Sequence, residues 1–334
     1  MLLEKIEGTI RKFNMLTPGD RVLIALSGGP DSVALAYLLK KMEKKWRLYL
    51  HLAHLNHMLR KDAGLDAEFA RKIAKRLCLP LSYEEVCVRD FAREEKLSVE
   101  EAARKARYNF LSCAARKNSL SKIALGHQED DQAETILMRF LRGSGLSGLR
   151  GMPVTRKMED CLIIRPLMEV SRKEILRFLS AKKITYRIDS SNLEDVYCRN
   201  KIRNKLIPYL EKEFNPRIKE TLVTLSENVA EDFDFLEEAG KKSFSAVSKD
   251  CSEHSVALDM KKFLHLHKAL QKQLVRLAIT RIKGDVRRID FRHWKELEDM
   301  VEKRPKGTIV DLPAEISAVK KEAAIVFYKR SQVK

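Results

Sequence analysis

The 334-residue sequence lacks the features that mark membrane, secreted and zinc-binding proteins. No apolar run approaches the roughly 18 residues that a membrane-spanning helix needs. Residues 1–7 include acidic side chains where a secretory signal would be apolar, so we expect no export. The six cysteines form no C-x-x-C pair and have no histidine at zinc spacing, which favours free thiols. These absences predict a soluble, cytoplasmic protein without a membrane partner.

Positive charge is what the sequence has in excess. It contains 65 Lys and Arg against 47 Asp and Glu, a net charge of +18, and the basic residues are spread along the whole chain. Basic proteins often bind nucleic acid, because counterions released from the phosphates favour association. A well-solvated basic surface is the alternative. The charge therefore favours a nucleic-acid partner, and the length allows two compact domains.

Short apolar runs alternate with helical periodicity from Arg21 to about Leu210. Ser98 with Glu101, and Ser171 with Glu174, have the spacing of helix capping boxes. Strands that alternate with helices predict an α/β fold with a doubly wound parallel sheet, which binds ligands beyond the carboxyl ends of its strands. We expect strands in 22–26, 48–55, 81–86, 123–125 and 162–167, and helices in 32–42, 62–77, 98–110, 128–141 and after 171.

The pattern changes from about Glu211 onward. A long, charged helical stretch begins at Asn215-Pro216 and runs to about Ser243. We place a domain boundary near residue 215, so that 1–215 forms the α/β domain and 216–334 a second, smaller, mainly helical domain. Further helical patterns cover 260–282 and 291–302, and strand patterns cover 307–313 and 323–328.

A glycine turn connects the first expected strand to the helix that follows. Two glycines let the backbone approach a ligand closely, and the amides at the helix start attract an anion. The serine hydroxyls can donate to phosphate oxygens, and the proline suits a first helical turn. Asp31 would repel phosphate unless a cation lay between them, which makes it a candidate Mg²⁺ ligand. A plain tight turn is the alternative, and the pattern is not a Walker A loop. The turn is Ser27-Gly28-Gly29-Pro30-Asp31-Ser32.

Further motifs lie at or beyond the ends of the expected strands. Arg104 and Arg107 are three residues apart, on one face of a helix. Asp131 and Glu134 have the same spacing near the start of another helix, where negative charge is favoured. The motifs are His54-Leu-Asn-His57-Met-Leu-Arg60, Gly126-His127-Gln128-Glu129-Asp130-Asp131-Gln132-Ala133-Glu134-Thr135, the glycine-rich run from Arg142 to Gly151, Asp189-Ser-Ser191-Asn192, and Arg199-Asn200-Lys-Ile-Arg203-Asn204.

Together these motifs resemble the ATP pyrophosphatase (PP-loop) superfamily and, within it, the tRNA(Ile)-lysidine synthetases, over residues 20–210. The S-G-G-x-D-S loop is shared across the superfamily. The run G-H-x-x-D-D-Q-A-E-T and the R-N-x-I-R motif are more particular to the lysidine synthetases. Gln128 stands where a second histidine is common, and Asn56 where an aspartate is. Beyond residue 215 the weaker resemblance fits a single tRNA-binding domain, as in the short form of the family.

The resemblance implies a ligase that uses ATP and Mg²⁺. Its substrates would be L-lysine and an isoleucine tRNA with a CAU anticodon. The enzyme would adenylate C2 of the wobble cytidine and then attach lysine to form lysidine, which switches codon reading from AUG to AUA. One sequence does not fix the oligomeric state, and a homodimer is among the states that it allows.

The resemblance also assigns roles to individual residues. Asp131 and Glu134 would hold the lysine, and one of them would accept a proton from its ε-amine. Guanidinium groups clamp phosphate oxygens, which suits Arg104 to catalysis at the α-phosphate. For each of these groups a solvated helix surface is the alternative. Asp31, Arg104, Asp131 and Glu134 are the expected catalytic residues; residues 27–32, Arg107 and His127 are expected to bind ATP; and Arg199, Arg203 and Lys205 are expected to contact tRNA phosphates.

Three other functions fit parts of the sequence. A PP-loop enzyme that thiolates cytidine usually has paired cysteines for a persulfide or an iron–sulfur cluster, and none are present. A small-molecule amidating ligase such as NAD synthetase would fit the loop but would not explain the +18 charge. A non-catalytic RNA-binding protein would not need the intact Asp31, Asp131 and Glu134.

Overall fold

The structure, a computed structural model, describes residues 2–59, 63–187, 198–286 and 288–330. Arg60 and the Asp189–Asn192 motif lie outside these residues. The chain divides into two compact units, Met1–Asn228 and Val229–Lys334. The division lies within the long helix α11 (Ile218–Val247), thirteen residues beyond the boundary near 215 that the composition suggests.

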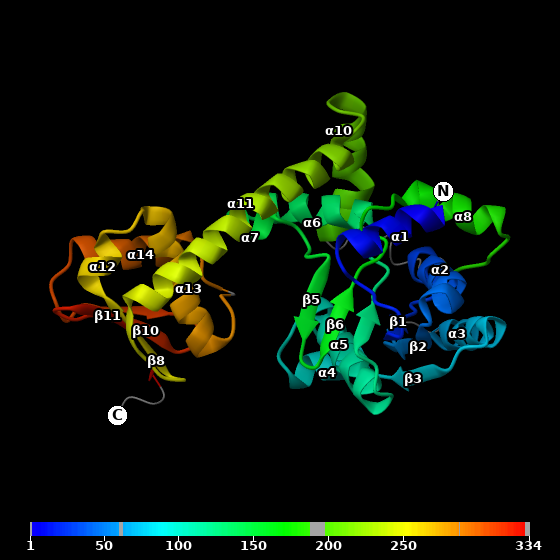
Figure 1. The fold of residues 1–334 in the computed structure, drawn as a ribbon, viewed down its shortest axis with the longest axis horizontal. Coiled ribbons are helices and arrows are strands. Elements are labelled where there is room, and N and C mark those ends of the chain that lie inside the picture. The colour runs from blue at the N-terminus through cyan, green and yellow to red at the C-terminus, as the bar shows by residue number, and fades with distance from the viewer. Residues whose placement is uncertain (1, 60–62, 188–197, 287, 331–334) are drawn as a thin grey trace. The chain divides into compact units, whose positions relative to one another are not determined.

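A six-stranded sheet forms the centre of the first unit (Figure 1). Its strand order is β3-β2-β1-β4-β6-β5, and the first five pair in parallel. The expected doubly wound parallel sheet is confirmed, with an antiparallel edge strand added. That strand, β5, is short and polar, so it has no apolar alternation by which the sequence could show it. The strands are β1 (Arg21–Ala25), β2 (Tyr49–Asn56), β3 (Leu81–Glu85), β4 (Lys122–Ala124), β5 (Thr155–Met158) and β6 (Cys161–Ile164).

The strand order reverses between β1 and β4, which is the topological switch point of this sheet. From β1 the chain proceeds outward to β2 and β3, then returns to β4 on the other side of β1. The segments after β1 and β4 therefore leave the sheet in opposite directions, which is where doubly wound folds bind ligands. Residue 126 must be small here, because a Cβ on Gly126 would come within 3.0 Å of the Ser32 nitrogen.

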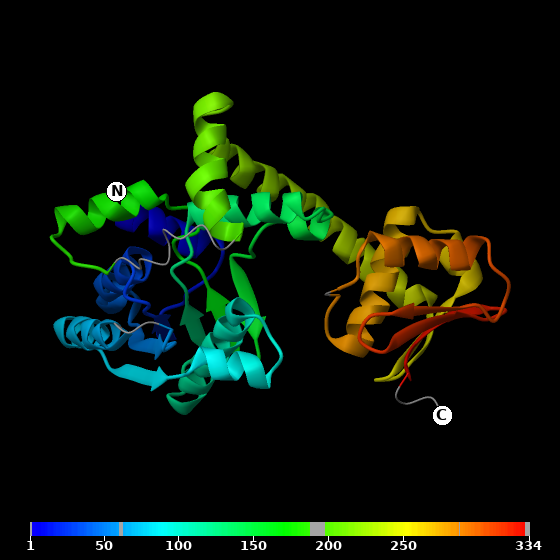
Figure 2. The same ribbon diagram turned by 180° about the vertical axis from the view of Figure 1, so that it is seen from behind.

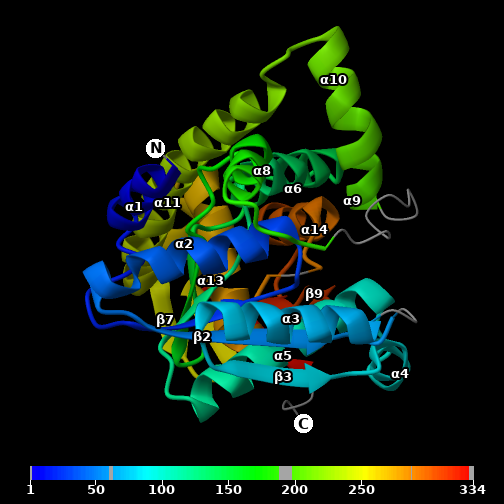
Figure 3. The ribbon, with the colours of Figure 1, turned by 90° about the vertical axis from the view of Figure 1, so that its right-hand side faces the viewer.

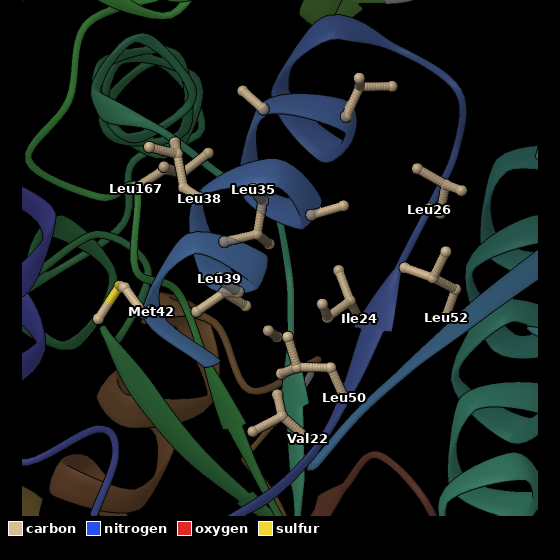
Figure 4. Close-up of a cluster of buried hydrophobic side chains, with 14 of the residues drawn as sticks. Val22, Ile24, Leu26, Leu35, Leu38, Leu39, Met42, Leu50, Leu52 and Leu167 are labelled. Carbon is tan, nitrogen blue, oxygen red and sulfur yellow. The ribbon is translucent and has the colours of Figure 1, made fainter. Parts of the chain in front are cut away.

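Helices cover both faces of the sheet. Val22 and Ile24 point to one face, where they pack against α2, α3 and α8 (Figure 4), while Leu23 points to the other face and packs against α5. Figure 3 shows α2 and α3 running alongside β2 and β3. The helices of this unit are α1 (Leu2–Lys12), α2 (Pro30–Trp46), α3 (Ala63–Leu77), α4 (Val88–Glu94), α5 (Val99–Lys117), α6 (Glu129–Leu141), α7 (Leu146–Leu149), α8 (Arg172–Ala181), α9 (Cys198–Lys201), the π-helical turn η2 (Ile202–Leu206), α10 (Ile207–Glu213) and the first part of α11.

The helix starts that matter for the site are capped as the sequence predicts. Ser98 and Glu101 form a capping box on α5, and Ser171 and Glu174 form one on α8. Gln128 caps α6, since its side chain accepts from the Asp130 backbone nitrogen at 2.6 Å. Gln128 thus has a structural role at the start of α6.

The second unit packs helices on a five-stranded antiparallel sheet of order β7-β8-β11-β10-β9 (Figure 2). Helices hold more of its residues than strands do, as expected, but only β9 and β11 are visible in the sequence pattern. The other three strands, β7, β8 and β10, are not predicted by the sequence pattern. The unit contains β7 (Ser248–Cys251), β8 (Ser255–Asp259), α12 (Met260–Leu264), α13 (Lys268–Lys283), α14 (Phe291–Glu302), β9 (Ile309–Leu312), β10 (Ile316–Lys320) and β11 (Ala324–Lys329). Across the described part of the chain, no helix has the length and apolar character needed to cross a membrane.

Candidate functional site

The turn after β1 is a closed loop held by its own serines. The Ser32 hydroxyl accepts from the Ser27 backbone nitrogen at 3.1 Å and donates to the Gly29 carbonyl at 3.0 Å. Gly28 has a φ of +86°, a conformation that suits glycine. Pro30 begins α2, so the first free amides of the helix open onto this loop. This geometry is compatible with the expected binding of a phosphate.

Asp31 lies at the start of α2 with one carboxylate oxygen engaged and one free. Its Oδ2 pairs with Arg172 at the start of α8, whereas its buried Oδ1 has no hydrogen-bond partner. Burial, opposed by the attraction of Arg172 and assisted by the charge of Asp131, raises the pKa of Asp31 to about 6. A buried carboxylate oxygen without a donor suits a cation. In the described ranges no group of three His, Cys, Asp or Glu could hold a metal, so a Mg²⁺ here would take its other ligands from phosphates and water.

The acidic pair on α6 is bound by two arginines. Arg199 lies 2.7 Å from Asp131 Oδ1 and 2.8 Å from Glu134 Oε2, and Arg203 Nε lies 2.5 Å from Glu134 Oε1. Glu134 is 2% exposed. The structure thus brings together two sets of residues for which the sequence suggested separate roles, in lysine binding and in tRNA binding.

Packing explains why these arginines reach the acidic pair. Leu137 of α6 packs with Ile202 and Ile207, which places α9 and η2 against α6. Arg199 and Arg203 are four residues apart and so share a face toward the carboxylates. That complementarity, i,i+4 arginines against an i,i+3 acidic pair, is a signal that sequence reasoning could have used. Lys205, on the same π-helical turn, is exposed.

A cluster of arginines surrounds Tyr108 on α5. Arg104 and Arg156 each lie 4.9 Å from the centre of the Tyr108 ring, and Arg107 lies 5.6 Å from it. Burial alone would raise the pKa of Tyr108, but the charges of these arginines and of Arg165 outweigh it and lower the pKa. The Nε atoms of Arg107 and Arg156 are buried without hydrogen-bond partners. Such a concentration of unsatisfied guanidinium groups suits phosphate oxygens.

Arg156 and Arg165 are site residues that the motifs do not contain. Arg156 lies on the polar edge strand β5, and Arg165 follows β6 directly and is 2% exposed. Neither β5, which contains Arg156, nor β6, which precedes Arg165, has a recognisable motif. Only the sheet order, with β6 beside β4, shows that they lie near the motif residues.

His127 follows β4 and faces this cluster. Arg165 Nε donates to His127 Nδ1 at 3.3 Å. Burial lowers the pKa of His127 well below its usual value, and the charges of Arg165, Arg107 and Arg199 lower it further. Asp130, by contrast, has a supporting role: it accepts from the Arg172 backbone nitrogen at 3.1 Å and pairs with Lys219 at 2.8 Å.

Two histidines lie at the end of β2, and burial lowers the pKa of each. His54 Nδ1 donates to the Leu26 carbonyl at 2.7 Å, and burial lowers its pKa. Burial, with the charge of Arg107, lowers the pKa of His57 to about 4. These contacts favour a structural role for His54 at the end of its strand.

The glycine-rich segment after α6 is fixed to that helix. Arg139 donates to the carbonyls of Gly148 and Gly151 at 2.8 and 2.7 Å. Gln132 accepts from the Met152 backbone nitrogen at 2.7 Å. Gly151 has a φ of +67°, and a Cβ there would collide with Gln132, so the glycine is required. The segment is therefore anchored to α6 at Gln132 and at Arg139.

The chain is similar to known proteins of one family. Residues 2–210 match the family model of the PP-loop domain. A tRNA(Ile)-lysidine synthase of Clostridioides difficile (strain 630) is 35% identical over 327 residues, which cover 98% of this chain and 70% of that protein. Another, from Caldanaerobacter subterraneus subsp. tengcongensis, is 36% identical over 330 residues, covering 98% of this chain and 69% of that protein.

A solved structure supports the fold. The U34-tRNA thiolase NcsA from Methanococcus maripaludis superposes with a TM-score of 0.57 at 19% identity, over 69% of this chain and 78% of that one. At this identity the likeness concerns the fold alone. The sequence relatives are more specific, and with the PP-loop match they show that the chain belongs to the tRNA(Ile)-lysidine synthase family.

Proposed function

We propose that the chain attaches L-lysine to C2 of the wobble cytidine in an isoleucine tRNA with a CAU anticodon, in the cytoplasm. The family membership supports an ATP-dependent, tRNA-modifying ligase. The cytidine O2 attacks the α-phosphorus of ATP, and pyrophosphate leaves. The lysine ε-amine then attacks C2, the amine loses a proton, and AMP leaves. The lysidine so formed reads AUA instead of AUG.

The observation that carries this proposal is that arginine side chains and carboxylates lie close together near the carboxyl ends of β1 and β4. The reaction needs cations for the phosphates of ATP and carboxylates for the ammonium of lysine. The unsatisfied Arg107 supplies the first, and the pair Asp131 and Glu134 supplies the second. The groups are close enough to interact, since the charge of Asp131 affects the pKa of both Arg107 and Asp31.

The loop residues 27–32 would hold the phosphates of ATP, with Arg104 and Arg107 at the α-phosphate. Mg²⁺ would bind the free Oδ1 of Asp31 and would neutralise charge on the phosphates. Asp131 and Glu134, the carboxylates that would bind the lysine, are paired with Arg199 and Arg203 in the structure. A guanidinium that leaves a carboxylate can bind a phosphate, so contact of these arginines with tRNA stays a prediction, as does contact of the exposed Lys205.

The test is incorporation of radiolabelled lysine into a transcript of isoleucine tRNA with a CAU anticodon, in the presence of ATP and Mg²⁺. A methionine tRNA transcript, which has the same anticodon, is the matched control. We expect label in the isoleucine transcript alone, with one pyrophosphate released per lysine attached.

Other outcomes would redirect the proposal. Pyrophosphate release that depends on tRNA but leaves no lysine in the product would keep the adenylation step and reject lysine as the acceptor. Absence of both signals from a protein that binds ATP would reject the ligase assignment.

A further inference from the structure

The contact between Arg165 and His127 determines which ring nitrogen of the histidine bears the proton. Arg165 Nε lies 3.3 Å from His127 Nδ1. An arginine side chain has donors and no acceptor, and it stays protonated in proteins. The nitrogen that accepts its hydrogen bond therefore has a free lone pair. In a neutral imidazole the proton is then on Nε2.

Arg165 is held firmly enough to impose this choice. Its side chain is 2% exposed, and its Nη1 donates to the Pro153 carbonyl at 2.6 Å. The two contacts use separate nitrogens of one planar group, so the direction of the Nε–H bond is fixed. Rotation of the arginine would break both contacts at once.

The groups around His127 prevent a second proton from binding. Arg165 comes from the end of β6, Arg104 and Arg107 from α5, and Arg199 from α9, and all four disfavour an imidazolium. Asp131 of α6 is paired with Arg199 and Arg203, which offset its charge. His127 thus remains an uncharged ring with one N–H.

We propose that Arg165 is a positioning residue that fixes His127 as a neutral Nε2–H donor to a phosphate oxygen of the nucleotide. The identity of that acceptor rests on the proposed function, whereas the tautomer does not. His127 directly follows Gly126, on which a Cβ would come within about 3 Å of the backbone of residues 31 and 32, and it faces the arginine cluster. An N–H donor in this place adds to the electrostatic stabilisation of the anion without a proton transfer.

This assignment also restricts the chemistry. A histidine protonated on Nε2, with its Nδ1 bound to an arginine, has no lone pair to offer the substrate and cannot act as a general base. The proton lost by the lysine amine would then go to a carboxylate of α6. The proposal thus separates the donor side of the site, at His127, from the acceptor side, at Asp131 and Glu134.

The test reads the tautomer directly. In protein labelled with ¹⁵N-histidine, long-range ¹H–¹⁵N correlation spectra distinguish a protonated from an unprotonated ring nitrogen, and the His127→Gln variant assigns the His127 signals. We expect the Nε2–H tautomer, without titration between about pH 5.5 and 8, because burial and then the surrounding positive charge lower the pKa of His127 well below its usual value. In Arg165→Met the loss of one positive charge should raise the pKa, so that His127 begins to titrate in this range. A Mg²⁺–ATP analogue that is not hydrolysed should shift the Nε2–H signal of the wild type.

A second pair of variants tests the donor. His127→Gln keeps an N–H donor, whereas His127→Leu does not, and a hydrogen bond to a charged group predicts roughly ten- to hundredfold slower pyrophosphate release in the leucine variant than in the glutamine variant. The signals of the other histidines report whether each variant is folded, and Arg165→Lys replaces the methionine variant if that one unfolds. An Nδ1–H tautomer in the wild type, or a tautomer and pKa that Arg165 variants leave unchanged, would overturn the proposal. If lysine incorporation fails while the tautomer is as expected, the proposed function is wrong and the positioning role stands.

Discussion

The ionised carboxylate of Asp31 lowers the stability of the folded protein. Burial raises its pKa from 3.8 to about 6, so the ionised form is less stable in the fold than in the unfolded chain. The raised pKa contributes stability that is present below pH 3.8 and is lost as the pH rises through about 6. Asp31→Asn removes this cost, and we expect it to increase the free energy of unfolding by about 1–3 kcal/mol near pH 8.

Urea unfolding of the two proteins at several pH values measures this effect. The advantage of the asparagine variant should disappear as the pH falls from about 6 to 4. The same variant should release no pyrophosphate, because it lacks the proposed Mg²⁺ ligand. A variant that is less stable than wild type at pH 8 would show that the Arg172 contact outweighs the burial of the charge.

Glu134 provides a second test at the scale of the residue. Glu134→Gln keeps the shape of the side chain but removes the charge that would bind the lysine ammonium. We expect the KM for lysine to rise by about tenfold or more, and the KM for ATP by much less, since a charged hydrogen bond contributes about 1.5–3 kcal/mol. Steady-state kinetics with each substrate varied separately gives both values. Glu129→Gln, on the same helix, is the matched control, and equal increases in both KM values for Glu134→Gln would contradict a lysine-binding role.

Some of the site residues could be predicted from the sequence, and others could be identified only from the structure. Asp31, Arg107, Asp131 and Glu134 belong to recognisable motifs, and the fold places them together. Arg165 could not be found in this way, because it follows a buried strand with no motif and acts only through its neighbours in space. The spacing of Arg199 and Arg203 matches that of the acidic pair, but the spacing alone does not bring them together, since the contact depends on how η2 packs against α6.

At the scale of the element, the contact between β4 and α2 tests the phosphate loop. Gly126→Ala would place a Cβ about 3.0 Å from the backbone of Ser32, and backbone cannot move away as a flexible side chain would. We expect the loop to shift, with weaker ATP binding and a loss of stability of about 1–3 kcal/mol. Gly8→Ala is the control: it lies exposed in α1 with nothing within 4 Å, so the alanine should stabilise the protein by about 0.5–1 kcal/mol.

Calorimetric ATP titration and thermal unfolding measure both variants. Normal ATP affinity in Gly126→Ala would mean that the nucleotide does not depend on the loop geometry seen here. The strands and helices around this contact were predictable, because β1, α2 and β4 each show a strong period or a glycine turn. The close approach of Gly126 was not, because it arises from the pairing of strands about 100 residues apart.

At the scale of the whole molecule, the fold of the first unit was predictable and that of the second was so only in part. Alternating strands and helices in sufficient number determine a doubly wound sheet. The second unit builds its sheet from strands of four to six residues, of which β9 and β11 were predicted and β7, β8 and β10 were not, because so short a strand carries little periodic signal of its own. The unit boundary shows the same limit, since α11 continues through it without a break in its helical pattern.

The net charge of +18 is shared between the two units. Residues 229–334 contain 22 Lys and Arg against 17 Asp and Glu, so the first unit holds most of the excess. If tRNA contacts both units, each phosphate contact contributes about −0.7 to −0.9 to the slope of log K against log salt. A chain that ends at residue 228 should therefore bind tRNA more weakly and with a shallower slope, while most of the slope should remain.

Filter binding of the isoleucine tRNA transcript between about 50 and 300 mM KCl measures both slopes. ATP binding by the shortened chain is the control, because it shows that the first unit is folded. An unchanged slope would place every phosphate contact on the first unit, and the second unit would then have to contribute through base contacts or shape. A slope reduced by more than half would mean that the second unit binds more phosphates than its smaller share of the charge suggests.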